Sequence, residues 1–240
     1  MKRLILCFIY LIFLSVSLRA EKNEGIAYRD SILILAESMP SDTVRLAYLQ
    51  SMAYCHQYFP YNRYFATALY EEAKRQKNIF YENEGAYYLA GYYDKKHDPD
   101  SLTYWVNQLK ELVSGVGTYD YYLERKAAIG RALASKRMIE KAVHVTKEVL
   151  EEAIAHNSNN GKIAAYNSLG CAYSVSSRPE EALKVLMKAY HEFKPGTKPF
   201  LKVDILSRIT QVYGNGGDDK SKMPYLCEMD KTLQLSLIHI

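Results

Sequence analysis

The residue types that most often carry catalysis or bind metals are dispersed along this chain. None of the six histidines pairs with a Cys, an Asp or another His at a spacing typical of a metal site. No phosphate-binding loop, nucleophile elbow or HExxH sequence occurs. The adjacent acids Glu151-Glu152 and Glu180-Glu181 have the pattern of solvated helix positions rather than of an acid–base pair. We therefore expect no enzyme, no catalytic residue, no metal site and no cofactor.

The cysteines indicate packing rather than covalent cross-linking. Cys7 lies in an apolar N-terminal run, and Cys55, Cys171 and Cys227 are widely spaced within predicted helices. An odd number of separated cysteines does not form a disulfide framework, even in an oxidising compartment. We interpret these three as small packing residues, with a reactive thiol as the alternative.

Residues 1–20 have the pattern of a secretory signal peptide. Lys2 and Arg3 precede an apolar run, and small residues at Ser17 and Ala20 offer cleavage positions. The apolar run is shorter than the roughly 20 residues that span a bilayer. The alternative is a buried N-terminal helix. The sequence predicts export, with the mature protein on the periplasmic side of the inner membrane.

Charge excludes one class of partner. The formal net charge is +4, but removal of residues 1–20 takes away Lys2, Arg3 and Arg19 and no acidic residue, so the two signs become almost balanced. No block of Lys and Arg remains that would neutralise many phosphates, so we expect no nucleic-acid binding through this region. With 48% hydrophobic and 24% charged residues, the chain has the composition of a folded protein.

The last six residues, 235–240, read Leu-Ser-Leu-Ile-His-Ile. This string can be encoded by the end of a transposon-based sequencing adapter. We therefore expect residues 235–240 to be an artefact of a truncated reading frame and exclude them from the fold.

A repeated pattern is clearest over residues 163–196. Two large residues flank a Leu-Gly pair on one predicted helix, and a small, a large and a small residue follow on the next. The residues are Tyr166, Leu169, Gly170, Tyr173, Ala182, Leu186 and Ala189. This pattern resembles the tetratricopeptide repeat (TPR), in which paired antiparallel helices stack into a solenoid.

Weaker copies of the pattern lie in phase with this unit. Aligned on the glycine position, they give Tyr54, Gly91, Gly130, Gly170 and Thr210, at nearly constant steps along the chain. Glycine inside a helix costs about 1 kcal/mol relative to alanine, so its recurrence needs a reason. We expect close helix–helix approach there, met from the second helix by the small residues Ala66, Ala142 and Ala182.

The sequence therefore predicts an all-α fold, and the resemblance implies a right-handed α-solenoid of about five TPR-like helix pairs. No Gly- or Ser-rich linker divides it, so we expect one solenoid over residues 21–234. Prolines mark predicted helix ends throughout. The expected helices cover 24–38, 43–58, 61–76, 79–95, 99–114, 119–136, 138–155, 160–176, 179–194, 199–214 and 222–234.

In TPR arrays the first helices line a concave groove, and the resemblance implies which positions face it. They are Tyr48, Ser51, Cys55, Tyr58, Phe59, Tyr88, Tyr92, Lys95, Lys96, Glu124, Arg131, Ser135, Asn167, Ser174, Asp204 and Gln211. The groove would be aromatic in its N-terminal half, where most of the 22 tyrosines lie, and polar in its C-terminal half. Interhelical packing is the alternative role for each tyrosine. The basic clamp with which some TPR domains hold a C-terminal carboxylate is not reproduced.

These observations favour an exported module that binds a protein or peptide segment. In architecture, residues 1–234 resemble the extracytoplasmic sensor portion of Bacteroidetes membrane-bound regulators. There a TPR array precedes a membrane span and a histidine kinase or DNA-binding output. This resemblance implies a role in signal transduction and contact with the membrane only through a downstream span. The alternative is a freestanding periplasmic scaffold or assembly protein without signalling output.

Overall fold

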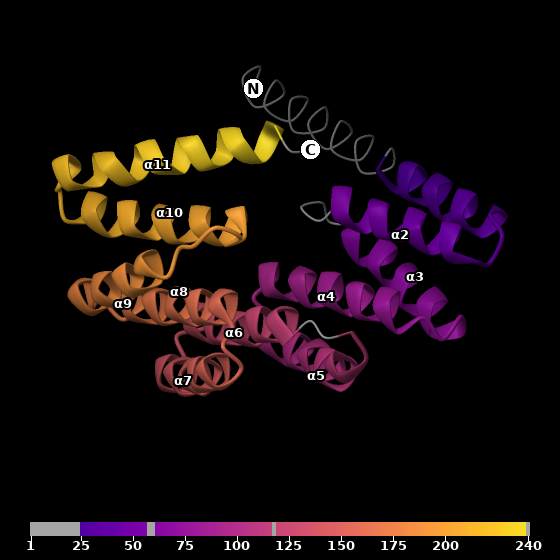
Figure 1. Ribbon diagram of the computed structural model, residues 1–240, viewed down its shortest axis with the longest axis horizontal. Coiled ribbons are helices and arrows are strands. Elements are labelled where there is room, and N and C mark those ends of the chain that lie inside the picture. Colours follow the sequence, from indigo (N-terminus) through magenta and orange to yellow (C-terminus); the bar gives the residue numbers. More distant parts are fainter. Residues whose placement is uncertain (1–24, 57–60, 117–118, 239–240) are drawn as a thin grey trace, which may run out of the picture. The chain divides into compact units, whose positions relative to one another are not determined.

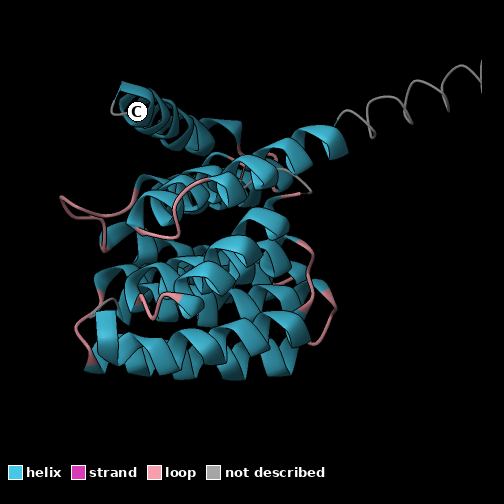
Figure 2. Ribbon diagram, turned by 90° about the vertical axis from the view of Figure 1, so that its right-hand side faces the viewer, coloured by secondary structure: helices cyan, strands magenta, loops and turns pink. Residues whose placement is uncertain are grey.

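The computed structural model describes residues 25–56, 61–116 and 119–238, with the backbone alone for residues 114–116 and 235–238 (Figure 1). The predicted signal peptide, residues 1–20, lies outside them. Almost every described residue outside the short turns is helical, and no strand occurs among them (Figure 2). The all-α prediction is therefore confirmed. The helices are 25–38, α2 (Thr43–Cys55), α3 (Asn62–Arg75), α4 (Ile79–Lys95), α5 (Pro99–Val116), α6 (Tyr119–Ser135), α7 (Ile139–Ala155), α8 (Asn159–Val175), α9 (Pro179–His191), α10 (Pro199–Asn215) and α11 (Asp219–Ile238).

The described helices form two compact units, one up to residue 88 and one from residue 89 onward, and α4 contributes to both. In the first unit α2 packs on α3. In the second, each helix from α5 to α11 packs on the next one in the sequence. In addition, α6 packs directly on α8, and α8 on α10. Neighbours in sequence are thus neighbours in space within each unit, as in an α-solenoid.

The turns between helices recur at a fixed interval. A residue with positive φ comes just after the end of a helix at six turns: Lys77, His97, Arg137, Asn157, Ser177 and Gly217. Successive members of this set are separated either by one constant interval, as from Lys77 to His97, or by twice that interval, as from His97 to Arg137. At the Asn157 turn the amide of Ser158 donates to the carbonyl of Ala153 (2.8 Å), and that of Asn157 to Ile154 (3.1 Å). These two bonds define a Schellman motif, which the other turns repeat. These turns therefore recur in register, and a helix pair with its connections spans the interval from Arg137 to Ser177.

The residue after each positive-φ position is placed to start the next helix. Ser158 accepts from the amide of Gly161 (2.9 Å), and Asp218 accepts from that of Ser221 (3.0 Å). Asp98 caps α5 in the same way. A polar side chain at this position satisfies a backbone amide that has no partner within its helix. Ending and starting signals in adjacent residues explain why the connections are so short.

The core is built from stripes along successive helices. In α9, Ala182, Leu186 and Ala189 are fully buried, at the spacing that places side chains on one helical face. In the preceding helix, Leu169 is buried, whereas Tyr166 and Tyr173 are half-buried. The ring centre of Tyr173 lies 4.8 Å from the guanidinium carbon of Arg178. Aromatic side chains therefore pack at the edges of these stripes.

Two of the predicted glycines lie where helices approach closely. A Cβ added to Gly130 would collide with Oγ1 of Thr146 and lie 2.6 Å from Oγ of Ser168. A Cβ added to Gly170 would lie 2.6 Å from Cδ2 of Leu186. The side chains that meet these glycines thus sit one turn beyond Ala142 and Ala182, which were expected there. The carbonyl of Ala142 is itself 3.3 Å from the Cβ position at Gly130.

Gly91 has different surroundings. A Cβ there would first meet Nη2 of Arg125, at 2.7 Å, and Arg125 belongs to α6 rather than to α5. Gly130 and Gly170 lie equally far before the turn residues that follow them, and the residue at that distance before His97 is Ala90. Ala90 is fully buried. The helix-pair alignment from sequence was therefore shifted by one residue in α4.

The predicted helices differ from the observed ones mainly near the C-terminus. α9 ends at His191 rather than at 194, and a longer loop with Gly196 at φ 92° leads into α10. α11 begins at Asp219 rather than at 222, because Asp218 caps it, and it continues to Ile238 instead of ending at 234. Pro224 consequently lies inside α11 and not in its first turn. A proline inside a helix removes an amide donor, and a position near the helix start limits the disruption.

Candidate functional site

Four polar side chains on α4, α6, α8 and α10 form a row across the second unit. They are Asp94, Arg131, Asn167 and Asp204, and we call them the polar row. From each member to the next, the residue number rises by less than it does between equivalent turns, such as those at Arg137 and Ser177. The difference is about one helical turn. Each helix therefore contributes a residue one turn closer to its own start than the helix before it, and the row runs diagonally over the helices.

Arg131 is the cation of the polar row. Its Nη2 lies 2.8 Å from Oδ2 of Asp94, and the exposed fractions of the two side chains are 18% and 17%. Burial disfavours the charge on Arg131, but attraction to Asp94 and Asp204 outweighs it, so the pKa of Arg131 is raised. The guanidinium thus stays charged and is held between two carboxylates from different helices.

Asp204 is exposed at the surface and has Arg131, Arg208 and Asn167 near its carboxyl group. Burial raises the pKa of its carboxyl group, and the nearby cations Arg131 and Arg208 only partly offset this, while Asp94 adds to it. The charged form of Asp204 is therefore less well stabilised than that of an ordinary surface aspartate. A ligand that donates hydrogen bonds to this carboxylate would supply what the protein does not.

Asn167 lies close to Asp204 and is fully buried. Its amide is near enough to lower the pKa of Asp204, but neither its nitrogen nor its oxygen makes a hydrogen bond of normal geometry. Buried amide groups nearly always have partners, because an unsatisfied one costs about 1–3 kcal/mol. Its place in the polar row is therefore unusual for a residue that only packs.

A second ionic pair connects α6 with the start of α10. Nζ of Lys198 lies 2.6 Å from Oε1 of Glu124, whose side chain is 5% exposed. Burial raises the pKa of Glu124, and Lys198 and Arg125 oppose the shift. The same ammonium group lies 4.4 Å from the centre of the Tyr121 ring. Glu124, predicted to face the groove, thus already has a cation from the chain itself.

The predicted aromatic residues are placed as follows. Tyr48 is half-buried in α2, where burial and then Tyr28 raise its pKa. Tyr88, the last residue of the first unit, is only 9% exposed, so its ring offers little surface to a ligand. Tyr92 is half-buried, with the ammonium of Lys96 5.7 Å from its ring centre. Tyr58 and Phe59 lie outside the described residues.

The one-residue shift in α4 explains why Tyr88 is buried and why one member of the polar row was not predicted. With Ala90 at the glycine position, the groove-facing positions of α4 include Asp94 instead of Tyr92 and Lys96. Asp94 is the residue that pairs with Arg131. The signal that identifies it is the regular spacing of the turns, which places Asp94 at the end of α4, just before the turn at His97.

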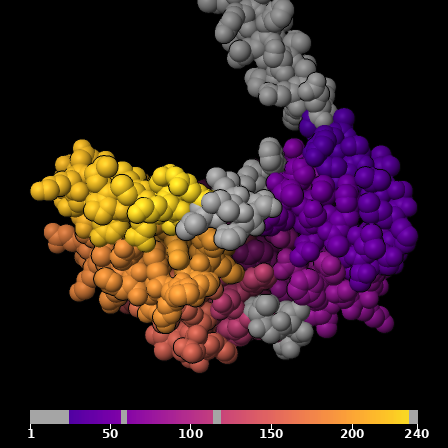
Figure 3. All heavy atoms as spheres, turned by 45° about the horizontal axis from the view of Figure 1, so that its top comes forward, coloured from indigo at the N-terminus to yellow at the C-terminus, as the bar shows by residue number. Residues whose placement is uncertain are grey.

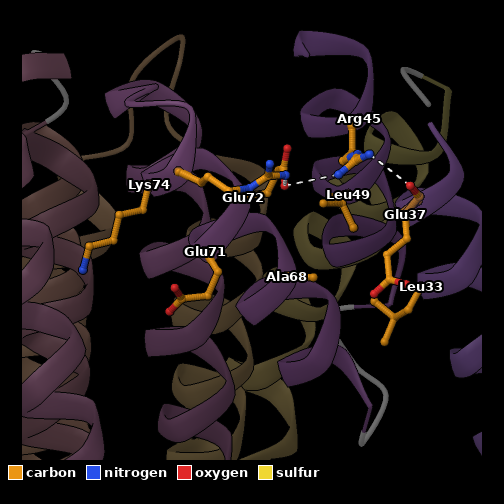
Figure 4. Close-up of a pocket in the computed structure, with 10 residues that line it drawn as sticks. Leu33, Glu37, Arg45, Leu49, Ala68, Glu71, Glu72 and Lys74 are labelled. Carbon is orange, nitrogen blue, oxygen red and sulfur yellow. Dashed lines mark hydrogen bonds and ion pairs between the residues drawn. The ribbon is translucent and has the colours of Figure 1, made fainter. Parts of the chain in front are cut away.

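The first unit contains a pocket of about 490 Å³ between the helix over residues 25–38, α2 and α3 (Figure 4). Leu33, Ala36, Leu49 and Ala68 supply its apolar lining, and charged side chains surround it. Figure 4 shows Arg45 between Glu37 and Glu72. The guanidinium of Arg45 donates to the backbone carbonyls of Glu37 (3.0 Å) and Met39 and to Oε2 of Glu72 (3.4 Å).

Glu72 is the centre of this network. Oε1 accepts from Ser41 (2.8 Å) and Gln76 (2.6 Å), and Oε2 accepts from Arg45 and Arg75. Burial alone would raise its pKa, but these hydrogen bonds and the charge of Arg45 lower it from 4.5 to about 2. The carboxylate is saturated with donors, so we interpret it as a structural link between α3 and the segment that joins the helix over 25–38 to α2.

In the described part of the chain, no group of three or more His, Cys, Asp or Glu side chains is arranged to hold a metal ion. Cys55 and Cys227 are exposed, and Cys171 is half-buried in α8. No protein-family model matches the chain, and no curated protein is significantly similar to it. None of the described helices is both long enough and apolar enough to cross a membrane.

Proposed function

We propose that this protein is an exported, TPR-like interaction module that binds a protein or peptide segment across the face carrying the polar row. The observation that carries the proposal is the polar row itself, in which the ion pair of Arg131 with Asp94, the buried amide of Asn167 and the exposed carboxylate of Asp204 come from α4, α6, α8 and α10. Such a row offers donors and acceptors to the polar groups of a bound segment, and its two carboxylates outnumber its one guanidinium. It suits a polypeptide better than a strongly charged partner such as nucleic acid.

The arrangement of the helices supports the TPR-like part of the proposal. In the second unit α6 packs on α7, α8 on α9 and α10 on α11, and in the first unit α2 packs on α3. First helices of neighbouring pairs touch directly, as α6 and α8 do. In a right-handed solenoid this contact places the first helices side by side on one face, where a ligand meets several repeats at once.

We further propose that the module is the sensing part of a membrane-bound regulator, held on the periplasmic side of the inner membrane. The signal-like residues 1–20 support this proposal. A freestanding periplasmic scaffold is the alternative. The genomic sequence downstream of residue 234 separates them: the regulator requires one membrane span followed by an output domain, and the scaffold has neither.

The binding proposal is tested by selecting ligands from a displayed library of random peptides against the immobilised full chain. Affinities of selected peptides are then measured for the parent, Asp204→Asn and Arg131→Ala. We expect each substitution to weaken binding at least about tenfold, equivalent to about 1.4 kcal/mol. Lys141→Ala, on the exposed side of α7, is the matched control and should bind as the parent does.

Circular dichroism of each variant separates loss of binding from loss of fold. Asp204→Asn keeps the size and shape of the side chain and removes only its charge, so its helical content should equal that of the parent. Selection of no peptide at all, or equal affinity in both polar-row variants and the parent, would show that this face is not the binding surface.

A further inference from the structure

The chain contains two Asn-Gly pairs, Asn160-Gly161 and Asn215-Gly216. Asparagine followed by glycine is the sequence most prone to deamidation, because glycine has no side chain to hinder its own backbone nitrogen from reaching the asparagine side chain. The reaction also requires the asparagine backbone to leave the helical conformation. The structure therefore decides which of the two pairs can react.

Asn160-Gly161 is held in place at the start of α8. Nδ2 of Asn160 donates to Oδ2 of Asp120 (3.1 Å), and the amide of Gly161 donates to Oγ of Ser158 (2.9 Å). Gly161 is buried, and a Cβ there would lie 2.7 Å from Cδ1 of Leu123. The reacting nitrogen and the reacting side chain are thus both hydrogen-bonded, and the core covers the nitrogen.

Asn215-Gly216 lies at the turn between α10 and α11, at the left-hand edge of Figure 1. Asn215 is the last residue of its helix, and both residues of the pair are exposed. α11, drawn in yellow, lies at the surface in Figure 3. The Gly216 amide, which is the reacting nitrogen, donates to the carbonyl of Val212 (3.2 Å) at this helix end. Helix ends open at little cost in free energy.

We propose that Asn215 is a site of spontaneous modification, at which it deamidates to aspartate and isoaspartate. The backbone nitrogen of Gly216 loses its proton to water or hydroxide and bonds to Cγ of Asn215. The bond from Cγ to the side-chain nitrogen breaks, and that nitrogen leaves as ammonia. Water then opens the five-membered imide at the side-chain carbonyl to give aspartate, or at the backbone carbonyl to give isoaspartate. Water is the only co-reactant, and nothing is oxidised or reduced.

The product alters the turn that connects α10 to α11. Isoaspartate adds one atom to the backbone between Gly214 and Gly217, where the amide of Gly217 now donates to the carbonyl of Gly214 (3.1 Å). It also places a carboxylate at the C-terminal end of α10, where the helix dipole disfavours negative charge, and close in sequence to Asp218. We expect the modified turn to be looser and to be cleaved more readily by a protease.

The test measures the conversion of both asparagines in one sample. The full chain is incubated at mildly alkaline pH, folded and in denaturant, and peptide mapping gives the rate at each site. The protection of a site is its unfolded rate divided by its folded rate. We expect the protection of Asn160 to exceed that of Asn215 at least about tenfold, the ratio given by a barrier difference of about 1.4 kcal/mol. Asn215→Gln should abolish the signal assigned to position 215. Equal protection at the two sites would overturn the proposal.

Discussion

The carboxylate of Glu72 accepts the hydrogen bonds that tie α3 to the segment between the helix over residues 25–38 and α2. Replacing Glu72 by glutamine removes its negative charge. The residue is 8% exposed, and its carboxylate receives hydrogen bonds from Ser41, Arg45, Arg75 and Gln76. Glutamine has one acceptor oxygen, and its amide nitrogen would face donors. The guanidinium of Arg45, with 15% of its side chain exposed, would lose its only carboxylate partner in the described residues.

The magnitude follows from the depressed pKa of Glu72, which is lowered from 4.5 to about 2. Because the folded-state pKa is the lower one, the ionised carboxylate stabilises the folded protein above the unfolded value of 4.5, and this stability is lost as the pH falls towards 2. At pH 7 the full contribution is about 3 kcal/mol, as an upper value. At pH 3 roughly 1.4 kcal/mol of it remains.

The assay is urea unfolding of the full chain and of Glu72→Gln at pH 7 and pH 3, followed by circular dichroism. We expect the variant to be less stable by about 2–3 kcal/mol at pH 7, a shift of the midpoint of about 1 M urea or more. The difference between the two proteins should shrink by about half at pH 3. Other carboxylates titrate equally in both proteins, so they cancel in this comparison.

Glu71→Gln is the matched control, because Glu71 also lines the pocket but is exposed on the preceding position of α3. It should change the stability by less than about 0.5 kcal/mol at either pH. A difference between parent and Glu72→Gln that is the same at pH 7 and pH 3 would refute the reasoning. It would show that the loss comes from packing and not from the charge.

Three further predictions concern the second unit and use the same unfolding assay. Gly130→Ala should destabilise the protein by about 1–3 kcal/mol, because the new methyl group collides with Thr146 and Ser168. Gly214→Ala, whose new methyl group has its nearest neighbour at 3.7 Å, should stabilise the protein by about 0.5–1 kcal/mol. Equal effects of the two substitutions would contradict the close approach at Gly130. Gly217→Ala should cost about 1 kcal/mol, because φ is 73° there, and no cost would mean that the turn differs from the one described. Lys198→Met should lower the stability by about 3–5 kcal/mol, because it leaves the buried carboxylate of Glu124 without this cation. A second substitution, Glu124→Gln, should restore most of the lost stability. A double variant as unstable as the single one would show that Lys198 acts through packing alone.

The helices and most of their ends could be predicted from sequence because the signals are local. Asp98 and Pro99 start α5, and Pro179 starts α9, at the residues where the sequence placed them. The end of α9 and the start of α11 were misplaced. No glycine or proline marks the end of α9 at His191. The start of α11 is set by the side chain of Asp218, which lies before the start that the sequence predicted.

The candidate site was predictable in three of its four members. Arg131, Asn167 and Asp204 were named because their helices carry a glycine or threonine in phase with the repeat. Asp94 was missed because α4 contains both Ala90 and Gly91, and the motif favoured the glycine. Small residues at adjacent positions make a motif ambiguous by one residue, and one residue rotates the predicted face by about 100°.

Other contacts had no local signal. The pair between Lys198 and Glu124 joins residues far apart in the sequence, and it depends on the irregular loop before α10. The network around Glu72 likewise joins a loop serine, a residue of α2 and a residue of the same helix. Sequence periodicity predicts which face of a helix is buried, but not which charged side chains meet at its edge.

The length of the repeat itself determines where the polar row lies. The turns recur at a constant interval, so equivalent positions on successive helix pairs recur at that same interval. A residue that shifts by one helical turn per pair therefore recurs at a slightly shorter interval than the turns do, as Asp94, Arg131, Asn167 and Asp204 show. Insertion of one residue in a turn would leave the core stripes of each pair intact. It would displace the later pairs relative to the earlier ones, although each member of the row would keep its place on its own helix. The row is thus a property of the stacking, and a single displaced pair is enough to break it without unfolding any helix.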